Sequence, residues 1–204
     1  MPLKFELCPG RMIGGNHPCF IIAEIGQNHQ GDIEIAKKMI KMDCGADCAK
    51  FQKSELENKF SKRALERPYT SKHSWGKMYG EHKRHLEFSH EQYRELQKYA
   101  KEVGIFFTAS GMDEMAVEFL HDLNVPFFKV GSGDTNNFPY LEKTAKKGFY
   151  YKKKSAFIAI IQHTHGNVKD LNKSSPQPKR FQHHQQHQFD CCSGLTSYGK
   201  KAKC

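Results

Sequence analysis

The chain has 204 residues, 38% of them hydrophobic, and a formal net charge of +10, so its size predicts one domain, or two at most. No apolar run reaches the ~18 residues of a membrane-spanning helix, and the first residues lack the apolar stretch of a secretory signal, so neither segment is expected. Seven cysteines without a CxxC pair argue against a zinc ribbon or a disulfide scaffold and favour reduced thiols in a cytoplasmic protein.

Apolar runs alternate with amphipathic stretches along the first 148 residues. Each run is short and almost wholly hydrophobic, which is typical of a strand buried on both faces of a parallel sheet. The stretches between them carry apolar residues at helical spacing. In chain order we predict a strand at 20–25, a helix at 33–42, a strand at 47–52, a helix at 90–103, a strand at 105–108, a helix at 113–123, a strand at 127–130 and a helix at 139–148.

A long polar segment, residues 53–87, interrupts this alternation. It is rich in Lys, Arg, His and Tyr and contains the single tryptophan, Trp75. A loop of this length inside a compact domain is usually functional or disordered. We interpret its basic part, residues 72–85, as a solvated lid or loop rather than a nucleic-acid surface. After it, Ser89 and Gln92 have the spacing of a capping box that begins the next helix.

The last 56 residues differ from the rest in composition. Residues 149–204 hold 10 basic and 2 acidic residues, so they carry +8 of the total charge of +10. They include a His/Gln tract at 182–188 and a Ser/Pro/Lys stretch. Such low complexity cannot bury enough apolar area to offset the entropy of ordering the chain. We expect a mostly disordered basic tail, in which only residues 156–161 are apolar enough to form a strand.

Four strand–helix units in a row predict parallel strands joined by right-handed crossovers. Two architectures satisfy this order. An open doubly wound sheet usually carries a GxGxxG fingerprint after its first strand, and residues 26–31 do not match it. A (β/α)₈ barrel needs eight units over roughly 250 residues, of which residues 20–148 supply four. The pattern therefore favours the first half of a barrel.

Polar residues stand where each predicted strand ends, and in parallel α/β folds the chemistry lies at those carboxyl ends. Two lysines there would form a cationic floor, and the Gly-Ser-Gly turn at 131–133 could offer backbone N–H and hydroxyl groups. This combination suits a phosphate or carboxylate ligand. The candidates are Glu24, Asn28 and His29 at the first strand, Lys50 and Gln52 at the second, Thr108 and Ser110 at the third, and Lys129, Ser132 and Asp134 at the fourth.

Several of these candidates also have a simpler interpretation, in which the residue has a structural role and binds no ligand. A single lysine at a strand end is more often a solvated rim residue, and residues 131–133 are more often only a turn. Glu24 differs, because an ionised carboxylate inside an apolar strand is costly unless it is paired. His29 is more often a loop hydrogen-bonder than a metal ligand, since no second histidine or carboxylate stands at ligand spacing. No metal site is therefore predicted in this chain.

Four long motifs, found in order, resemble the sialic acid synthase family. They are FIIAEIGQNHQGD (20–32), CGADCAKFQ (44–52), FTASGMDEMAVEFL (107–120) and VPFFKVGSGDTNNFPYLEKTAKKG (125–148). The resemblance is nearly continuous over residues 1–148 and includes the long polar segment. It implies a (β/α)₈ barrel followed by a small antifreeze-like domain in a homodimer.

The resemblance also implies an activity. The family condenses phosphoenolpyruvate with N-acetylmannosamine, or its 6-phosphate, to N-acetylneuraminate or its 9-phosphate. A Mn²⁺ or Mg²⁺ ion orients and polarises the sugar aldehyde. C3 of phosphoenolpyruvate attacks that aldehyde, water adds at C2, and phosphate leaves by C–O cleavage. The reaction needs cations for a trianionic substrate and a base for the water.

Residue roles follow from matching positions in the motifs. Glu24 matches an acidic residue at the reacting centre, and Asp134 and Gln52 match positions near the sugar or the intermediate. Asn28 and His29 belong to the same patterned loop, which the resemblance places in the substrate site. The positions that would hold phosphoenolpyruvate are Lys50, Ser110, Lys129 and Ser132.

The resemblance stops after Gly148. The two metal-binding histidines of the family have no counterpart in the tail, and His163 and His165 match none of its motifs. We therefore expect two regions: a truncated barrel at 1–148 and an unrelated tail at 149–204. Two hypotheses stay open: an enzyme of this family, and a catalytically inactive truncated isoform that acts only by binding, through its basic tail, to acidic partners or full-length subunits.

Overall fold

The computed structural model describes residues 4–42 and 45–147. The end of the last predicted helix, the expected tail at 149–204 and its possible strand at 156–161 lie outside the described residues. No helix in the part that the structure describes is long and apolar enough to cross a membrane.

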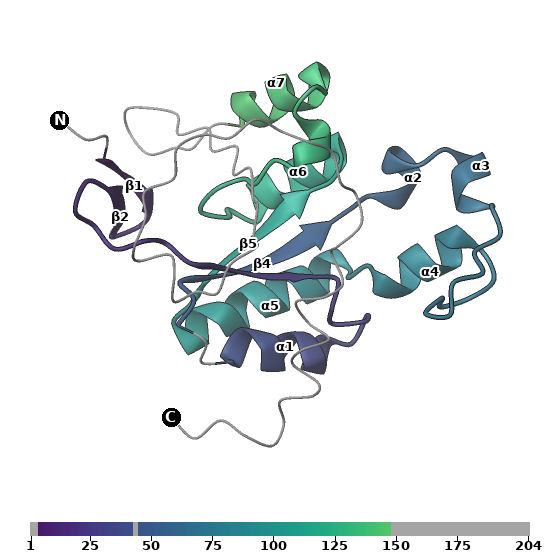
Figure 1. The fold of residues 1–204 in the computed structure, drawn as a ribbon, viewed down its shortest axis with the longest axis horizontal. Helices are drawn as coiled ribbons and strands as arrows, with labels where there is room; N and C mark the ends of the chain where they lie inside the picture. The colour runs from purple at the N-terminus through teal and green to yellow at the C-terminus, as the bar shows by residue number, and fades with distance from the viewer. Residues whose placement is uncertain (1–3, 43–44, 148–204) are drawn as a thin grey trace. The chain divides into compact units, whose positions relative to one another are not determined.

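A three-stranded parallel sheet lies at the centre of the fold (Figure 1). Its strands are β3 (Ile22–Gly26), β4 (Cys48–Lys53) and β5 (Phe106–Gly111), in that spatial order. The register sets Glu24 beside Lys50, and Gln52 beside Ser110. The first three predicted strands and their parallel direction are therefore confirmed, which makes this an α/β fold.

The fourth predicted strand, residues 127–130, is wrong as a paired strand. These residues are largely buried, yet they join no ladder among the described strands. A side-chain hydrogen bond links this segment to the sheet, in which the Thr108 hydroxyl donates to the Phe127 carbonyl over 2.7 Å. The apolar run correctly indicated burial. Burial alone does not specify which backbone groups pair, and Pro126 just before the run has no N–H to donate.

Four helices follow the strands much as predicted. Ser89 and Gln92 cap each other at the start of α5, and Gly104 ends that helix with φ +86°, in the left-handed region that glycine tolerates. Asn137 caps the last helix, so Pro139 is its second residue rather than its first. The helices are α1 (Ile33–Lys41), α5 (His90–Val103), α6 (Glu114–Asp122) and α7 (Phe138–Lys146).

Two parts of the fold were not predicted. An antiparallel hairpin of β1 (Lys4–Cys8) and β2 (Arg11–Gly14) precedes the sheet. The long polar segment is not an irregular loop, since it forms α2 (Leu56–Lys59), α3 (Lys62–Leu65) and α4 (Tyr79–Leu86). These helices are too short to show a helical period in the sequence, and aromatic contacts such as Tyr69 on Tyr79 hold the segment together.

The two faces of the sheet have different neighbours. Alternate residues such as Ala49, Phe51 and Phe107 enter the main core, where α1, α5 and α6 pack. On the other face, Cys48 and Phe106 belong to a smaller apolar cluster with the N-terminal hairpin. Further along the same face, towards the carboxyl ends, the side chains become polar. The fold thus places a polar surface directly beyond the smaller apolar cluster, on the same face of the sheet.

Candidate functional site

Lys50 is the centre of that polar surface. Its ammonium donates to Glu24 Oε1 over 2.5 Å, and to the Ser110 hydroxyl over 3.3 Å. The Lys50 side chain is 3% exposed, whereas the Glu24 carboxylate is 32% exposed and faces solvent in part. Three adjacent strands supply the three groups, because their register places these positions side by side on one face.

Burial changes the protonation chemistry of Lys50. Loss of water lowers the pKa of its ammonium, the Glu24 carboxylate acts in the opposite direction, and the positive charge of Lys129 lowers the pKa further. Lys129, which is half-buried, therefore lies within electrostatic reach of Lys50. Lys50 and Lys129 are two neighbouring cations, and the one carboxylate paired with Lys50 is Glu24. The positive charge that is left is one that a phosphate or carboxylate ligand can neutralise.

Other predicted residues border this cluster. Gln52 is half-buried and lies against Gly26, where an added Cβ would come within 3.7 Å of its amide nitrogen. Asp134 ends the short 3₁₀ helix η1 (Ser132–Asp134), in which Ser132 is the first residue. The Asn28 amide donates to the Ile25 carbonyl over 2.9 Å and so caps the end of β3. The ligand roles of these residues stay predictions.

His29 is not brought into the Lys50 cluster. Its ring is 1% exposed and stacks on Phe88 with 4.0 Å between ring centroids. It also packs near Phe51, a residue of the helix-covered face. Its Nδ1 accepts a hydrogen bond from the Gly31 N–H over 3.1 Å. Burial lowers the pKa of His29 to about 4, so the ring is neutral at pH 7 and orders the loop after β3.

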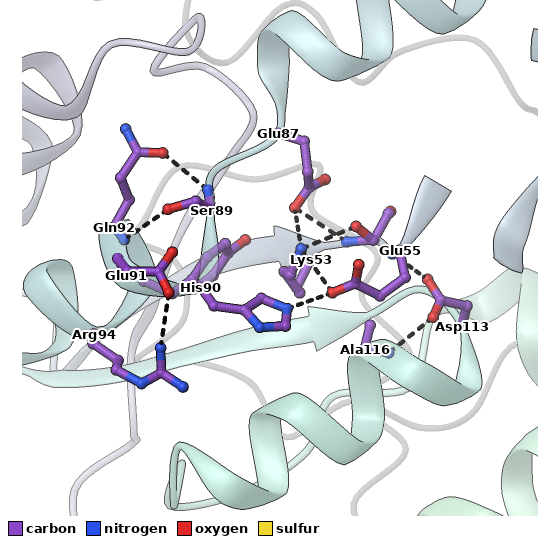
Figure 2. A network of polar contacts seen from close by, with 12 residues as sticks. Lys53, Glu55, Glu87, Ser89, His90, Glu91, Gln92, Arg94, Asp113 and Ala116 are labelled. Atoms are coloured by element: carbon purple, nitrogen blue, oxygen red, sulfur yellow. Dashed lines mark hydrogen bonds and ion pairs between the residues drawn. The ribbon is translucent and has the colours of Figure 1, made fainter. Parts of the chain in front are cut away.

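Figure 2 shows a second polar network, which the sequence patterns did not indicate. The buried Lys53 ammonium contacts Glu55 at 3.1 Å and Glu87 at 3.2 Å. His90 Nε2 lies 2.6 Å from Glu55 Oε1, and Asp113 accepts from the Glu55 backbone N–H over 2.7 Å. Lys53 directly follows the predicted second strand, so continuing the apolar alternation by one residue would have marked it as buried.

Glu87 is the unusual member of this second network. Its side chain is 10% exposed, and its Oε2 atom is buried without a hydrogen-bond partner among the residues that the structure describes. Burial raises the pKa of Glu87 from 4.5 to about 7, against the lowering effects of Lys53 and of the Ser54 N–H. The negative charge of Glu55 also raises the pKa of Glu87. Lys59 and Lys83 lie within electrostatic reach of Glu87.

Glu87→Gln is expected to change how stability depends on pH. The folded chain holds the Glu87 proton more tightly than the unfolded chain, so this group's contribution to stability is full below about pH 4.5 and is lost as the pH rises through about 7. The stability of the variant relative to the native chain should therefore rise by roughly 3 kcal/mol between pH 4 and pH 8. Urea unfolding across this range measures it.

The matched control for Glu87→Gln is Glu102→Gln, since Glu102 is exposed on α5. Its stability relative to the native chain should not vary over the same pH range. A difference between Glu87→Gln and the native chain that stays constant from pH 4 to pH 8 would contradict the raised pKa.

The described residues do not fit a divalent metal ion. Over 4–42 and 45–147, no group of three or more His, Cys, Asp or Glu side chains could hold one. The charged cluster at Lys50 presents ammonium groups, which repel a cation. Any divalent metal would need ligands from outside the described part of the chain.

The fold and the site define an α/β protein with a buried lysine, Lys50, on the carboxyl side of its parallel sheet. A model of the NeuB family matches residues 37–151. Human N-acetylneuraminate-9-phosphate synthase is 85% identical over 150 residues, which cover 72% of this chain and 42% of that protein. The Drosophila melanogaster protein of the same name is 61% identical over 128 residues, covering 62% and 34%.

A solved structure supports the same relationship. The N-acetylneuraminic acid synthetase from Leptospira borgpetersenii, crystallised in complex with citrate, has a TM-score of 0.60 and 28% identity, over 72% of this chain and 48% of that one. The chain belongs to the NeuB family, since the family model covers more than half of it. The resemblance to sialic acid synthases is thereby confirmed. The chain spans about two fifths of the length of the human and mouse relatives.

Proposed function

We propose that residues 1–148 form the first part of a (β/α)₈ barrel, in which three strands are paired, and hold its phosphoenolpyruvate site. The supporting observation is the cluster on the carboxyl side of the sheet, where Lys50 is buried against Glu24 and Ser110 with Lys129 in reach. The edge strands of the described sheet are β3 and β5. In a closed barrel, further strands would cover these two edges. Residues 149–204 would form a separate tail with no part in the barrel.

The proposed reaction is the condensation of phosphoenolpyruvate with N-acetylmannosamine 6-phosphate, or with the free sugar, in sialic acid biosynthesis. Lys50 and Lys129 would neutralise the carboxylate and phosphate of phosphoenolpyruvate, while the hydroxyls of Ser110 and Ser132 donate to its oxygens. Holding both anionic groups in place orients C3 towards the sugar aldehyde and excludes water from the nucleophile. Gln52 and Asp134 would hold the sugar.

Glu24 would act at C2 of phosphoenolpyruvate. Its carboxylate is paired with Lys50 yet partly exposed, so it could accept a proton from a water molecule that adds to C2. The intermediate then loses phosphate by cleavage of the C–O bond. Mn²⁺ or Mg²⁺, when bound through residues outside the described part, would supply Lewis-acid activation of the aldehyde. We further propose a cytoplasmic homodimer as the complete enzyme.

Binding of phosphoenolpyruvate to the full chain tests this proposal. A calorimetric titration should show saturable binding of phosphoenolpyruvate and much weaker binding of pyruvate, which lacks the phosphate. No release of inorganic phosphate is expected on adding N-acetylmannosamine 6-phosphate and Mn²⁺, because the two metal-binding histidines of the family have no counterpart in the sequence. A chain that is folded by circular dichroism but does not bind phosphoenolpyruvate would refute the proposal.

A further inference from the structure

Thr108 is a buried polar residue of β5 to which the proposed reaction gives no part. It is 0% exposed, and the strand register sets it beside Lys50 on β4. Its hydroxyl donates to the Phe127 carbonyl over 2.7 Å, so the buried group has a partner. That partner is a main-chain oxygen of residues 127–130, the segment that joins no ladder of the described sheet. Thr108 therefore ties β5 to this segment.

Residues 127–130 also carry Lys129, and neighbouring side chains of the segment enter different clusters. Phe127 belongs to the smaller apolar cluster, whereas Phe128 belongs to the main core. Lys129 follows two residues after Phe127, and its positive charge acts on Lys50. Its side chain therefore lies on the Phe127 side of the segment, towards the polar surface at the carboxyl ends of the strands.

The position of this segment along β5 needs a directional contact. In a paired strand, a run of evenly spaced backbone hydrogen bonds fixes the register, and residues 127–130 join no such run in the described sheet. The apolar contacts of Phe127 favour burial, but the hydrophobic effect has no preferred direction. A hydrogen bond does specify distance and direction. The Thr108 hydroxyl supplies such a bond two residues before Lys129.

We propose that Thr108 is a positioning residue for Lys129. Its hydroxyl sets where residues 127–130 lie against β5, and so holds the Lys129 ammonium near Lys50 although the two positive charges repel each other. The inference rests on the proposed function in that both ammonium groups bind phosphoenolpyruvate. Thr108 itself contacts no ligand in this proposal, and its contribution to binding passes through Lys129.

Thr108→Val removes the hydroxyl and keeps the branched shape, so the Phe127 carbonyl loses its donor. Calorimetric titration of the full chain should show phosphoenolpyruvate binding weakened by about three- to tenfold, the effect of one neutral hydrogen bond. Thr108→Ser restores the hydroxyl and should bind within about twofold of the native chain. Thr108→Cys carries a weaker donor and should fall between the two, and it replaces Thr108→Val where that variant does not fold.

The matched control is Thr144→Val on α7. Thr144 is 4% exposed, and its hydroxyl donates to the Tyr140 carbonyl over 2.7 Å, so the change removes the same kind of bond away from the site. It should leave the affinity unchanged. In the Lys129→Gln background, Thr108→Val should cost less than about twofold, because the group it positions is gone. Equal losses in both threonine variants, no recovery in Thr108→Ser, or additive losses with Lys129→Gln would overturn the proposal.

The pKa of Lys50 tests the positioning without any ligand, by NMR of isotopically labelled lysine side chains. The charge of Lys129 lowers this pKa together with burial, whereas Glu24 and Cys48 act in the opposite direction. In Thr108→Val, repulsion between the two ammonium groups moves Lys129 away, so the pKa of Lys50 should rise, as in Lys129→Gln. An unchanged pKa would overturn the role of Thr108. A native chain that binds no phosphoenolpyruvate would refute the proposed function, and this measurement would still decide on Thr108.

Discussion

Lys50→Gln should reduce the affinity of the chain for phosphoenolpyruvate by about 100-fold. The native ammonium is almost fully buried, and it is already oriented by Glu24 and Ser110. Its hydrogen bonds to an anionic ligand are of the charge-assisted kind, and their loss accounts for about tenfold to 100-fold. Glutamine also leaves the Glu24 carboxylate uncompensated beside the ligand, which adds repulsion. Calorimetric titration with phosphoenolpyruvate measures the loss.

The control for Lys50→Gln is Lys98→Gln, which removes the same charge from an exposed position on α5. It should leave the affinity within about twofold, because exposed charges are screened by solvent and salt. Ser110→Ala keeps the Lys50–Glu24 pair and should weaken binding by a smaller factor, so it tests the site even where Lys50→Gln lowers stability. Unchanged affinity in both Lys50→Gln and Ser110→Ala would show that phosphoenolpyruvate does not bind at this edge.

Leu96→Ala should destabilise the folded unit by about 2–5 kcal/mol. Leu96 lies on α5 and is 0% exposed, in the core where α5 packs against α1 and the sheet. Truncation removes buried methyl groups and leaves a cavity, because the surrounding sheet and helix relax only in part. A domain is usually stable by about 5–15 kcal/mol, so this single change removes a large share of it. Urea unfolding followed by circular dichroism measures the difference.

Lys98→Ala is the matched control on the same helix. Its side chain is exposed, so the change should alter the free energy of unfolding by less than about 0.5 kcal/mol. A loss below 1 kcal/mol for Leu96→Ala would mean that α5 is not closely packed on the sheet. A midpoint that shifts equally in both variants would point to the helix itself rather than to its packing.

The capped helices and the strand-end residues were predictable from sequence because their signals are local. Ser89 and Gln92 satisfy backbone N–H groups within one turn, so their spacing alone marks the helix start. The alternation in β4 likewise marks Lys50 as sharing a face with Cys48 and Gln52. The prediction of a strand at 127–130 is wrong because its apolar residues are buried without joining the described sheet.

His29 and Glu87 make contacts that local sequence patterns do not predict. Both carry side chains that a sequence marks as polar, and both are buried by residues distant in the chain or by neighbouring helices. His29 stacks on Phe88, and Glu87 contacts Lys53 across 34 positions. No spacing rule encodes these contacts, since they depend on how α4 and α5 meet the sheet.

The sequence by itself determined the family, the first three strands of the βα order and the set of polar residues at the strand ends, because repeating apolar periods and long ordered motifs are properties of neighbouring residues. Only the tertiary structure decided which of those polar groups meet. Strand register placed Glu24, Lys50 and Ser110 on one face, whereas the His29 ring stacks on Phe88 and lies outside this cluster. The physical reason is that burial and charge pairing depend on distances through space, which separation along the chain does not specify.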